Sequence, residues 1–320
     1  MSDDRHLGHV TVLTGERGGR YPDGNSLLVA GSEETVIIDP SLTVVARRDR
    51  LPRVDRVLVG HCHEDHVAGN HLFPDAPVLV HELDLPGLRS VDDLLARYGL
   101  GDPALESTFR ETVLRQFHYV PRPGAVPIRH GDVLDLGGGV RITVVHAPGH
   151  TPGHCAFLVE PDGVLALGDI DLSSFGPYYG DAVSSLDEFE RTLAEVRTLP
   201  ARWYATFHHI GVIDGREAFV ERLDRYAAVI GAREERLVEY LGEPRTIAEI
   251  VAHRFVYRPQ DDVLWADPVE RHSMVQHLER LCRAGRAAEV EPGRFLATGR
   301  RSTARPRSSA PASRPPSHPR

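Results

Sequence analysis

The sequence contains no lysine, so all 37 of its basic residues are arginine. A lysine nucleophile and a lysine Schiff base are therefore excluded from any reaction that the protein catalyses. Cysteine is also scarce, and its three residues are too scattered for a disulfide framework, which favours a reducing compartment. No apolar run approaches the roughly 20 residues that span a bilayer, and the first nine residues do not resemble a signal peptide. We therefore expect a cytoplasmic protein without a membrane segment.

The composition is that of a soluble globular protein, with 41% hydrophobic and 26% charged residues. A chain of 320 residues can bury a sizeable core, and we expect one large domain and a small one. Residues 300–320 hold six arginines, no acidic residue and many serines and prolines, which predicts a disordered tail. The formal charge is −9 with these arginines included, so the rest of the chain is more acidic still. This charge argues against nucleic acid as a partner.

A stretch rich in histidine follows the apolar run at residues 57–60, where a strand is expected to end. It contains His61, His63, Asp65 and His66, and imidazole nitrogen and carboxylate oxygen are ligands of zinc, iron and manganese. In an extended loop His61 and His63 point the same way and can converge on one ion. Asp65 and His66 would face a second position. The alternative interpretation is a solvated turn with adventitious metal binding.

The pattern His61-x-His63-x-Asp65-His66 resembles the signature of the metallo-β-lactamase fold hydrolases, a superfamily that includes glyoxalase II, ribonuclease Z and the β-lactamases. The resemblance covers about residues 8–213. It implies the α/β class and an αββα sandwich for residues 1–213, and the order strand, ligand loop, helix, strand fits this architecture. It also implies further metal ligands downstream.

Three downstream segments match the remaining ligands of that family. His150 matches the histidine of a Pro-Gly-His-Thr-Pro-Gly segment, and Asp169, at the end of a strand, matches the bridging aspartate. In residues 205–213, alignment of the trailing apolar residues places the last histidine on His209. Phe207 and His208 stand there in place of the family's Pro-Gly, which leaves His208 as the alternative.

The resemblance thus implies two metal positions that share one carboxylate. The expected ligands are His61, His63 and His150 for one ion, Asp65, His66 and His209 for another, and Asp169 between them. Two zinc ions are expected, with iron or manganese as alternatives. Asp39 ends an apolar strand and either orients the ligands from behind or belongs to an ordinary turn. His154 is interpreted as a packing or hydrogen-bonding residue.

Outside the ligand loops the sequence predicts mostly helical additions. Helical spacing interrupted by proline and glycine predicts a helical insertion at about residues 84–125, lying over the site. A long connecting helix is expected at residues 214–242. Residues 243–299 predict a helix, helix, hairpin order that resembles a winged helix, with Thr246 and Glu249 spaced as a capping box. Its mixed charge gives no clear nucleic-acid footprint, so packing or a homodimer contact is the expected role.

The resemblance implies a hydrolase in which a hydroxide shared by the metals attacks a carbonyl carbon, while Asp65 or water protonates the leaving group. The leading prediction is a glyoxalase II-like enzyme for a small-molecule thioester, ester or lactone. The alternatives are a phosphodiesterase or ribonuclease, an iron-dependent sulfur dioxygenase, and a DNA-binding metal sensor. Tyr119, Tyr178, Tyr179 and Asp171 are candidate pocket residues, with packing as the other interpretation for the tyrosines.

Overall fold

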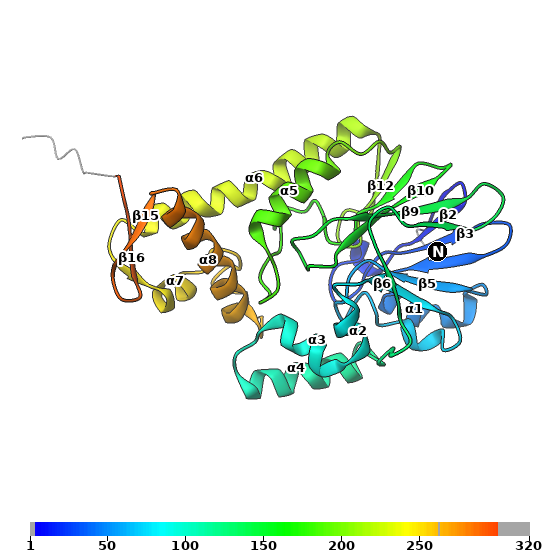
Figure 1. Ribbon diagram of the computed structural model, residues 1–320, viewed down its shortest axis with the longest axis horizontal. Helices are drawn as coiled ribbons and strands as arrows, with labels where there is room; N and C mark the ends of the chain where they lie inside the picture. Colours follow the sequence, from blue (N-terminus) through cyan, green and yellow to red (C-terminus); the bar gives the residue numbers. More distant parts are fainter. Residues whose placement is uncertain (1–3, 262, 300–320) are drawn as a thin grey trace, which may run out of the picture.

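The computed structural model describes residues 4–261 and 263–299. Two β-sheets pack face to face, and helices cover their outer faces (Figure 1). The first sheet contains seven strands in chain order, β1 (Arg5–Leu7), β2 (Val10–Leu13), β3 (Ser26–Ala30), β4 (Thr35–Ile38), β5 (Arg56–Val59), β6 (Val78–His81) and β7 (Val126–Ile128). The second contains six, in the order β13 (Val212–Asp214), β12 (Trp203–Ala205), β11 (Val164–Ala166), β10 (Cys155–Glu160), β9 (Arg141–His146) and β8 (Val133–Asp135). Strands β4 to β7 are parallel, as are β11 and β12.

Successive side chains of the central strands point to opposite faces of their sheet, so they pack into different hydrophobic cores. In β4, Val36 and Ile38 face the second sheet and share a core with Phe157 of β10, while Ile37 faces the outer helices. In β10, Ala156 points away from Phe157 into a third core. This period of two is what strands buried on both faces require. The layering of helix, sheet, sheet and helix confirms the predicted αββα sandwich.

The helices of the outer layers come from three parts of the chain. The first sheet packs with α1 (Leu42–Ala46) and with the predicted helical insertion, which forms α2 (Leu85–Arg89), α3 (Val91–Tyr98) and α4 (Pro103–Arg115). The second sheet packs with α5 (Leu186–Val196) and α6 (Arg216–Tyr240). Within residues 4–261 and 263–299, no helix is long and apolar enough to cross a membrane.

In the expected order strand, ligand loop, helix, strand, the helix belongs at residues 67–72, but the structure has only a single 3₁₀ turn there, Asn70–Leu72. Its backbone is fixed by a contact outside the segment, because Gly69 N–H donates to the carbonyl oxygen of Pro40 at 2.6 Å. A Cβ atom at Gly69 would lie only 2.9 Å from Pro40 Cβ. The hydrogen bond and the close contact with Pro40 fix the backbone at Gly69, in the middle of the segment where the helix was expected.

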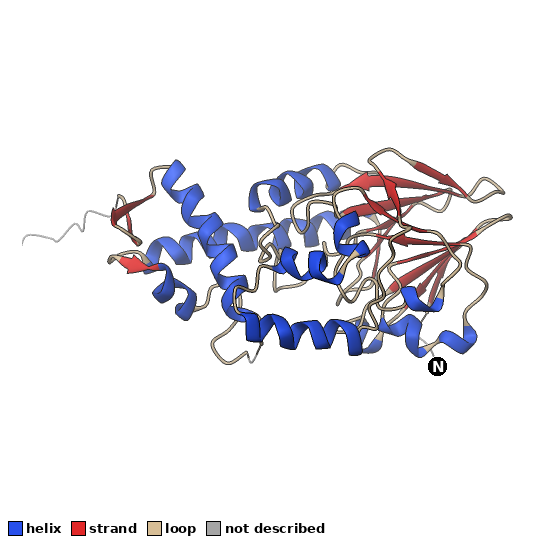
Figure 2. Ribbon diagram, turned by 60° about the horizontal axis from the view of Figure 1, so that its bottom comes forward, coloured by secondary structure: helices blue, strands red, loops and turns tan. Residues whose placement is uncertain are grey.

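The C-terminal part has a core of its own. It contains the end of α6, α7 (Ile247–His253), α8 (Ala266–Arg283) and a three-stranded sheet ordered β14 (Arg245–Thr246), β16 (Arg294–Ala297) and β15 (Ala287–Glu291). The predicted capping box of Thr246 and Glu249 begins α7. Figure 2 shows helices filling the space between the large sheets and this small one. The winged-helix assignment and the domain boundaries stay predictions, and the predicted disordered tail at residues 300–320 lies outside the described residues.

Candidate metal centre

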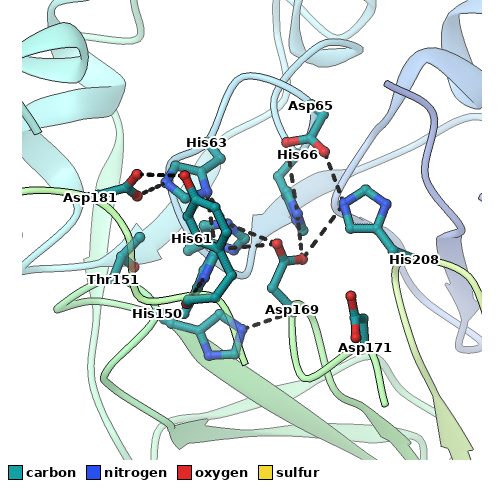
Figure 3. Close-up of polar contacts among 12 residues, drawn as sticks. His61, His63, Asp65, His66, His150, Thr151, Asp169, Asp171, Asp181 and His208 are labelled. Carbon is teal, nitrogen blue, oxygen red and sulfur yellow. Dashed lines mark hydrogen bonds and ion pairs between the residues drawn. The ribbon is translucent and has the colours of Figure 1, made fainter. Parts of the chain in front are cut away.

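The candidate ligands lie at one edge of the sandwich, in loops that follow strands of both sheets (Figure 3). These residues are His61, His63, Asp65 and His66 after β5, His150 after β9, Asp169 after β11 and His208 after β12. Cys155 N–H donates to Gly60 O at 2.8 Å and joins the start of β10 to the end of β5. The two sheets therefore hold the ligand loops against one another.

His61, His63 and His150 form the first cluster. Nε2 of His61 lies 2.9 Å from Nδ1 of His63, and Nε2 of His150 lies 3.1 and 3.0 Å from these two atoms. A tetrahedral zinc ion with Zn–N bonds of about 2.0–2.1 Å keeps its nitrogen ligands about 3.3 Å apart. Three imidazole nitrogens at this spacing fit the ligand set of one metal ion.

Asp65, His66 and His208 form the second cluster, and all three are buried. Nε2 of His208 lies 3.1 Å from Oδ2 of Asp65, and Nε2 of His66 lies 4.0 Å from Oδ1 of Asp65. The three ligand atoms all lie within 4.8 Å of one another. Two imidazoles and a carboxylate in this arrangement suit zinc, iron or manganese.

Asp169 lies between the clusters and faces both (Figure 3). Its Oδ2 is 3.2 Å from Nε2 of His150 in the first cluster, and its Oδ1 is 2.9 Å from Nε2 of His66 in the second. This oxygen and this nitrogen are buried and form an ion pair with each other, but neither makes a hydrogen bond. Buried polar atoms without a hydrogen bond are costly, and two metal ions bridged by Asp169 would satisfy them. The residues present therefore fit a pair of ions.

The expectation for His209 is corrected to His208, because the structure brings His208 and not His209 to the second cluster. His209 occupies a tight turn with φ of 61°, and its side chain is 30% exposed. Its Nε2 lies 4.0 Å from Oδ2 of Asp171, which is not a member of either cluster. Phe207 stacks on the His66 ring with centroids 3.6 Å apart, which directs the next residue into the site.

Backbone carbonyls orient two of the histidines. Nδ1 of His150 lies 2.9 Å from the carbonyl oxygen of Tyr178, and Nδ1 of His208 lies 2.7 Å from that of Gly19. Each Nδ1–H donates to its carbonyl, so each Nε2 keeps a lone pair for a cation. Such partners fix the tautomer and the ring orientation of metal-binding histidines.

Carboxylates orient two further histidines. Nε2 of His63 lies 2.8 Å from Oδ2 of Asp181, and Nδ1 of His66 lies 3.2 Å from Oδ2 of Asp39. The other oxygen of Asp39 accepts the Gly60 N–H at 2.6 Å. Asp39 thus lies behind the ligands, where the first of its two interpretations placed it. Asp181 was missed, since it lies twelve positions after Asp169 in a loop without regular structure.

Asp84 is a second carboxylate that sequence reasoning missed, and it holds two ligand loops together. It is fully buried and accepts hydrogen bonds from Cys62 N at 3.1 Å, Gly153 N at 2.9 Å and Thr151 Oγ1 at 2.6 Å. Arg97 of α3 pairs with it. The sequence did contain a signal for Asp84, because this aspartate closely follows the apolar strand β6, as Asp39 follows β4 at the same edge of the sheet.

His154 uses both ring nitrogens inside the protein. Its Nδ1 lies 2.9 Å from the Ala147 carbonyl oxygen, and its Nε2 accepts the Asp169 N–H at 3.1 Å. Burial, together with the nearby His150, lowers the pKa of His154 to about 3. The ring is therefore a neutral support for the Asp169 loop, in agreement with its interpretation as a hydrogen-bonding residue.

The pKa values of Asp169 and His66 are shifted by the charged groups around them. Burial alone would raise the pKa of Asp169, but His66 and His150 outweigh burial and hold that pKa well below its usual range. Burial alone would lower the pKa of His66, but Asp169 and Asp39 raise it well above its usual range. The carboxylates are thus arranged to stabilise positive charge at this place, which divalent cations supply.

A cavity of about 270 Å³ opens beside both clusters. Its floor includes His63, Asp65, His150, Asp169 and His208. Its walls include residues from the helical insertion, such as Phe109, and from the C-terminal part, such as Trp265. Of the candidate pocket residues, Asp171 and Tyr178 line the cavity, whereas Tyr119 and Tyr179 are buried outside it.

Comparison with known proteins agrees with this architecture. A family profile described as the metallo-beta-lactamase superfamily matches residues 20–230. The crystal structure of the metallo-beta-lactamase family protein TTHA1429 from Thermus thermophilus superposes with a TM-score of 0.67, covering 91% of this chain and 99% of the other at 23% identity. This likeness shows the fold.

The curated relatives include proteins named as thioesterases. The acyl-coenzyme A thioesterase MBLAC2 of Gallus gallus is 29% identical over 168 residues, covering 47% of this chain and 59% of the relative. The atrochrysone carboxyl ACP thioesterase of Aspergillus fumigatus is 23% identical over 271 residues, covering 79% of this chain and 75% of the relative. The matched region spans 43% to 59% of the length of the first curated relatives, about half.

Proposed function

The chain belongs to the metallo-beta-lactamase superfamily, and on that premise we propose that it is a metal-dependent hydrolase of a small-molecule acyl thioester. The observation that carries the proposal is the position of Asp169 between two ligand clusters at the floor of a cavity. Two divalent ions are proposed, with zinc as the expected metal because imidazole and carboxylate ligands suit it. The names of the thioesterase relatives support the choice of a thioester.

The reaction adds water across the bond between the acyl carbon and sulfur. The carbon gains the oxygen of water, the carbon–sulfur bond breaks, and the leaving sulfur takes a proton, giving a carboxylic acid and a thiol. Ions bound at such a site lower the pKa of water and polarise a carbonyl group. We propose Asp65 as the residue that passes a proton to the leaving sulfur, because its side chain lines the cavity. Its Oδ2 lies 3.1 Å from Nε2 of His208.

The other candidate functions fit the site less well. A phosphodiester substrate calls for cationic side chains, but the chain has no lysine and none of the described residues that line the cavity is arginine. A sulfur dioxygenase with one iron would leave the second cluster unused, although its three ligands are buried and converge. An ester or lactone remains the second candidate substrate, because its carbonyl carbon presents the same target.

The proposal is tested by metal analysis combined with a substrate panel. Protein purified without added metal should contain about two ions per chain. It should hydrolyse acyl thioesters faster than lactones and leave a phosphodiester intact. Asp169→Ala should lose metal from both clusters and lower kcat/KM by more than about 100-fold, the upper end for residues that only support a metal ligand.

The matched control is Asp224→Ala, which removes an exposed aspartate of α6. This variant should keep both metal content and activity. Full metal content in Asp169→Ala would contradict the bridging role, and phosphodiester cleavage without thioester cleavage would overturn the proposed substrate.

A further inference from the structure

The cavity has an aromatic wall, part of which also contacts the ligand histidines, as Tyr98 does by stacking on His63. Seven aromatic side chains line it, and they come from regions that are far apart in the sequence. They are Tyr21 after β2, Tyr98 and Phe109 in the helical insertion, Phe175 and Tyr178 after β11, and Tyr257 and Trp265 in the C-terminal part. Two loops of the sandwich, the helical insertion and the C-terminal part thus converge on one surface.

Four of these rings form a continuous row, which we call the aromatic row. Tyr98 meets Phe109 edge to face, with centroids 4.9 Å apart and planes at 80°. Phe109 lies 5.5 Å from Trp265, which in turn lies 5.8 Å from Tyr21 at 77°. Tilted and edge-to-face contacts at these distances are the favoured geometry between aromatic rings. A further ring placed against the row would find the same kind of contact.

The polar groups of the row are already satisfied within the protein. The hydroxyl of Tyr21 donates to Oε1 of Glu64 at 2.9 Å, and the hydroxyl of Tyr98 donates to Oε2 of the same carboxylate. The row therefore offers a ligand its ring surfaces and not its hydroxyl groups. Leu100, Val263 and Val269 extend this apolar surface.

The charge of the lining residues and the volume of the cavity further limit which acyl groups can bind. Glu64, Asp171 and Asp181 line the cavity, and no arginine is among its described lining residues, so no arginine is there to pair with a negatively charged acyl group. The volume of about 270 Å³ is near the lower limit for small-molecule sites, which usually hold about 300–1,000 Å³. The volume therefore favours a single ring over a fused ring system.

We propose that the aromatic row is an acyl-binding subsite and that the acyl group of the substrate is an uncharged, single-ring aromatic acid such as a phenylacetyl group. This inference rests on the proposed function for its chemistry, since the subsite would place the thioester carbonyl beside the two clusters. Phe109 and Trp265 are then the residues that determine specificity, because neither belongs to a ligand cluster.

The first test compares phenylacetyl, hexanoyl, palmitoyl and succinyl thioesters of one thiol. Phenylacetyl should exceed hexanoyl by about 10-fold or more in kcat/KM, the size of discrimination that apolar pockets achieve. Palmitoyl and succinyl thioesters should be poorer still. Phe109→Ala should reduce the preference for phenylacetyl to about 2-fold or less, because the facing ring is lost, and should leave metal content unchanged.

Leu114→Ala provides the matched control, since Leu114 lies on the same helix α4 but is 42% exposed. This variant should keep the preference of the unaltered protein. Trp265→Leu offers a second route to the same result if Phe109→Ala does not fold. Equal rates for phenylacetyl and hexanoyl thioesters, or faster cleavage of the palmitoyl thioester, would overturn the subsite while leaving the proposed function intact.

The second test measures binding without hydrolysis. The chain has two tryptophans, so Trp203→Phe leaves Trp265 as a fluorescent reporter inside the cavity. Ketone analogues of the phenylacetyl and hexanoyl thioesters, with a methylene in place of sulfur, are the probes. Phenylacetyl ketone should change the Trp265 emission at about 10-fold lower concentration than hexanoyl ketone. Such binding without any thioester hydrolysis would uphold the subsite and refute the proposed function, and absence of binding would refute the subsite.

Discussion

The loops at the strand ends and the helical segments above them contribute different things to one cavity. The loops supply every member of the two ligand clusters, most of these side chains are buried, and His63, His150 and His208 each have a hydrogen-bonding partner outside the clusters. The helical insertion and the C-terminal part supply aromatic rings that contact one another, and of these Tyr98 also stacks on the ring of His63. The sandwich thus positions the groups for chemistry, and the additions shape the space in which a substrate lies.

This difference predicts separable effects of mutation. Changes in the loops should alter metal content, whereas changes in the additions should alter substrate preference or stability with the metal retained. Asp181 tests the boundary between the two regions, because it orients His63 and lies in the loop that also carries Tyr178, a wall residue. The following predictions run from the largest expected effect to the smallest.

The largest effect is expected for His208→Ala compared with His209→Ala. His208 faces Asp65 at 3.1 Å, so its removal should release one of the two proposed ions and lower kcat/KM by more than about 100-fold. His209 is partly exposed and lies 4.0 Å from Asp171, so its removal should keep both ions. Metal analysis of the two purified variants checks this prediction.

Because His208 and His209 are neighbours in one turn, the two alanine variants form a matched pair. Equal metal loss in both variants would show that the turn moves when ions bind. Metal loss in His209→Ala alone would support His209, the ligand expected from the sequence, over His208.

These two positions show where sequence reasoning reached its limit. The strands β3 and β4 and the capping box of α7 were predictable, because hydrophobic period and cap spacing are local signals. His208 was not, because the turn at residues 206–211 decides which side chain points inward. In that turn Thr206 N–H donates to Gly211 O at 2.8 Å and His209 takes a positive φ.

The supporting carboxylates were harder to predict for a related reason. Asp84 and Asp181 meet their partners across 22 and 118 positions of sequence. The position of Asp84 after β6 was a local signal, but no local pattern shows which distant groups either carboxylate contacts, because only the closure of the sandwich brings the loops together. The aromatic row has the same origin, since Tyr21 and Trp265 come from opposite ends of the chain.

An intermediate effect is expected for Asp181→Asn. The Asp181 carboxylate accepts a hydrogen bond from Nε2 of His63 and so leaves Nδ1 facing the first cluster. An amide can present its N–H₂ group to His63 and disturb this tautomer, so metal affinity should fall by about 10–100-fold. Competition with a chelator, followed by metal analysis, measures the change.

Asp92→Asn is the control, because Asp92 is an exposed residue of α3 whose ion pair is with Arg110 of α4 and not with a ligand histidine. It should leave the affinity unchanged. An unchanged affinity in Asp181→Asn, together with altered substrate preference, would place Asp181 among the wall residues and not among the supports of the clusters.

The smallest effect is expected in the additions, at Glu234 of α6. Partial burial raises the pKa of Glu234, but the hydrogen bond from His277 and the charge of Arg280 outweigh burial and lower that pKa. A carboxyl group whose pKa is lowered on folding stabilises the protein above its unfolded pKa, about 4.3 for glutamate. This contribution is lost as the pH falls below that value through the folded pKa.

Glu234→Gln should therefore lower the Tm near neutral pH and flatten its decline below about pH 4.3, while both ions stay bound at neutral pH. Glu235→Gln is the matched control, since Glu235 is 71% exposed and its pairing with Arg286 should contribute little. Both variants lose any bound metal alike in acid, so the difference between their Tm curves isolates Glu234. Parallel curves, or metal loss at neutral pH in Glu234→Gln alone, would break the separation between the ligand loops and the segments above them.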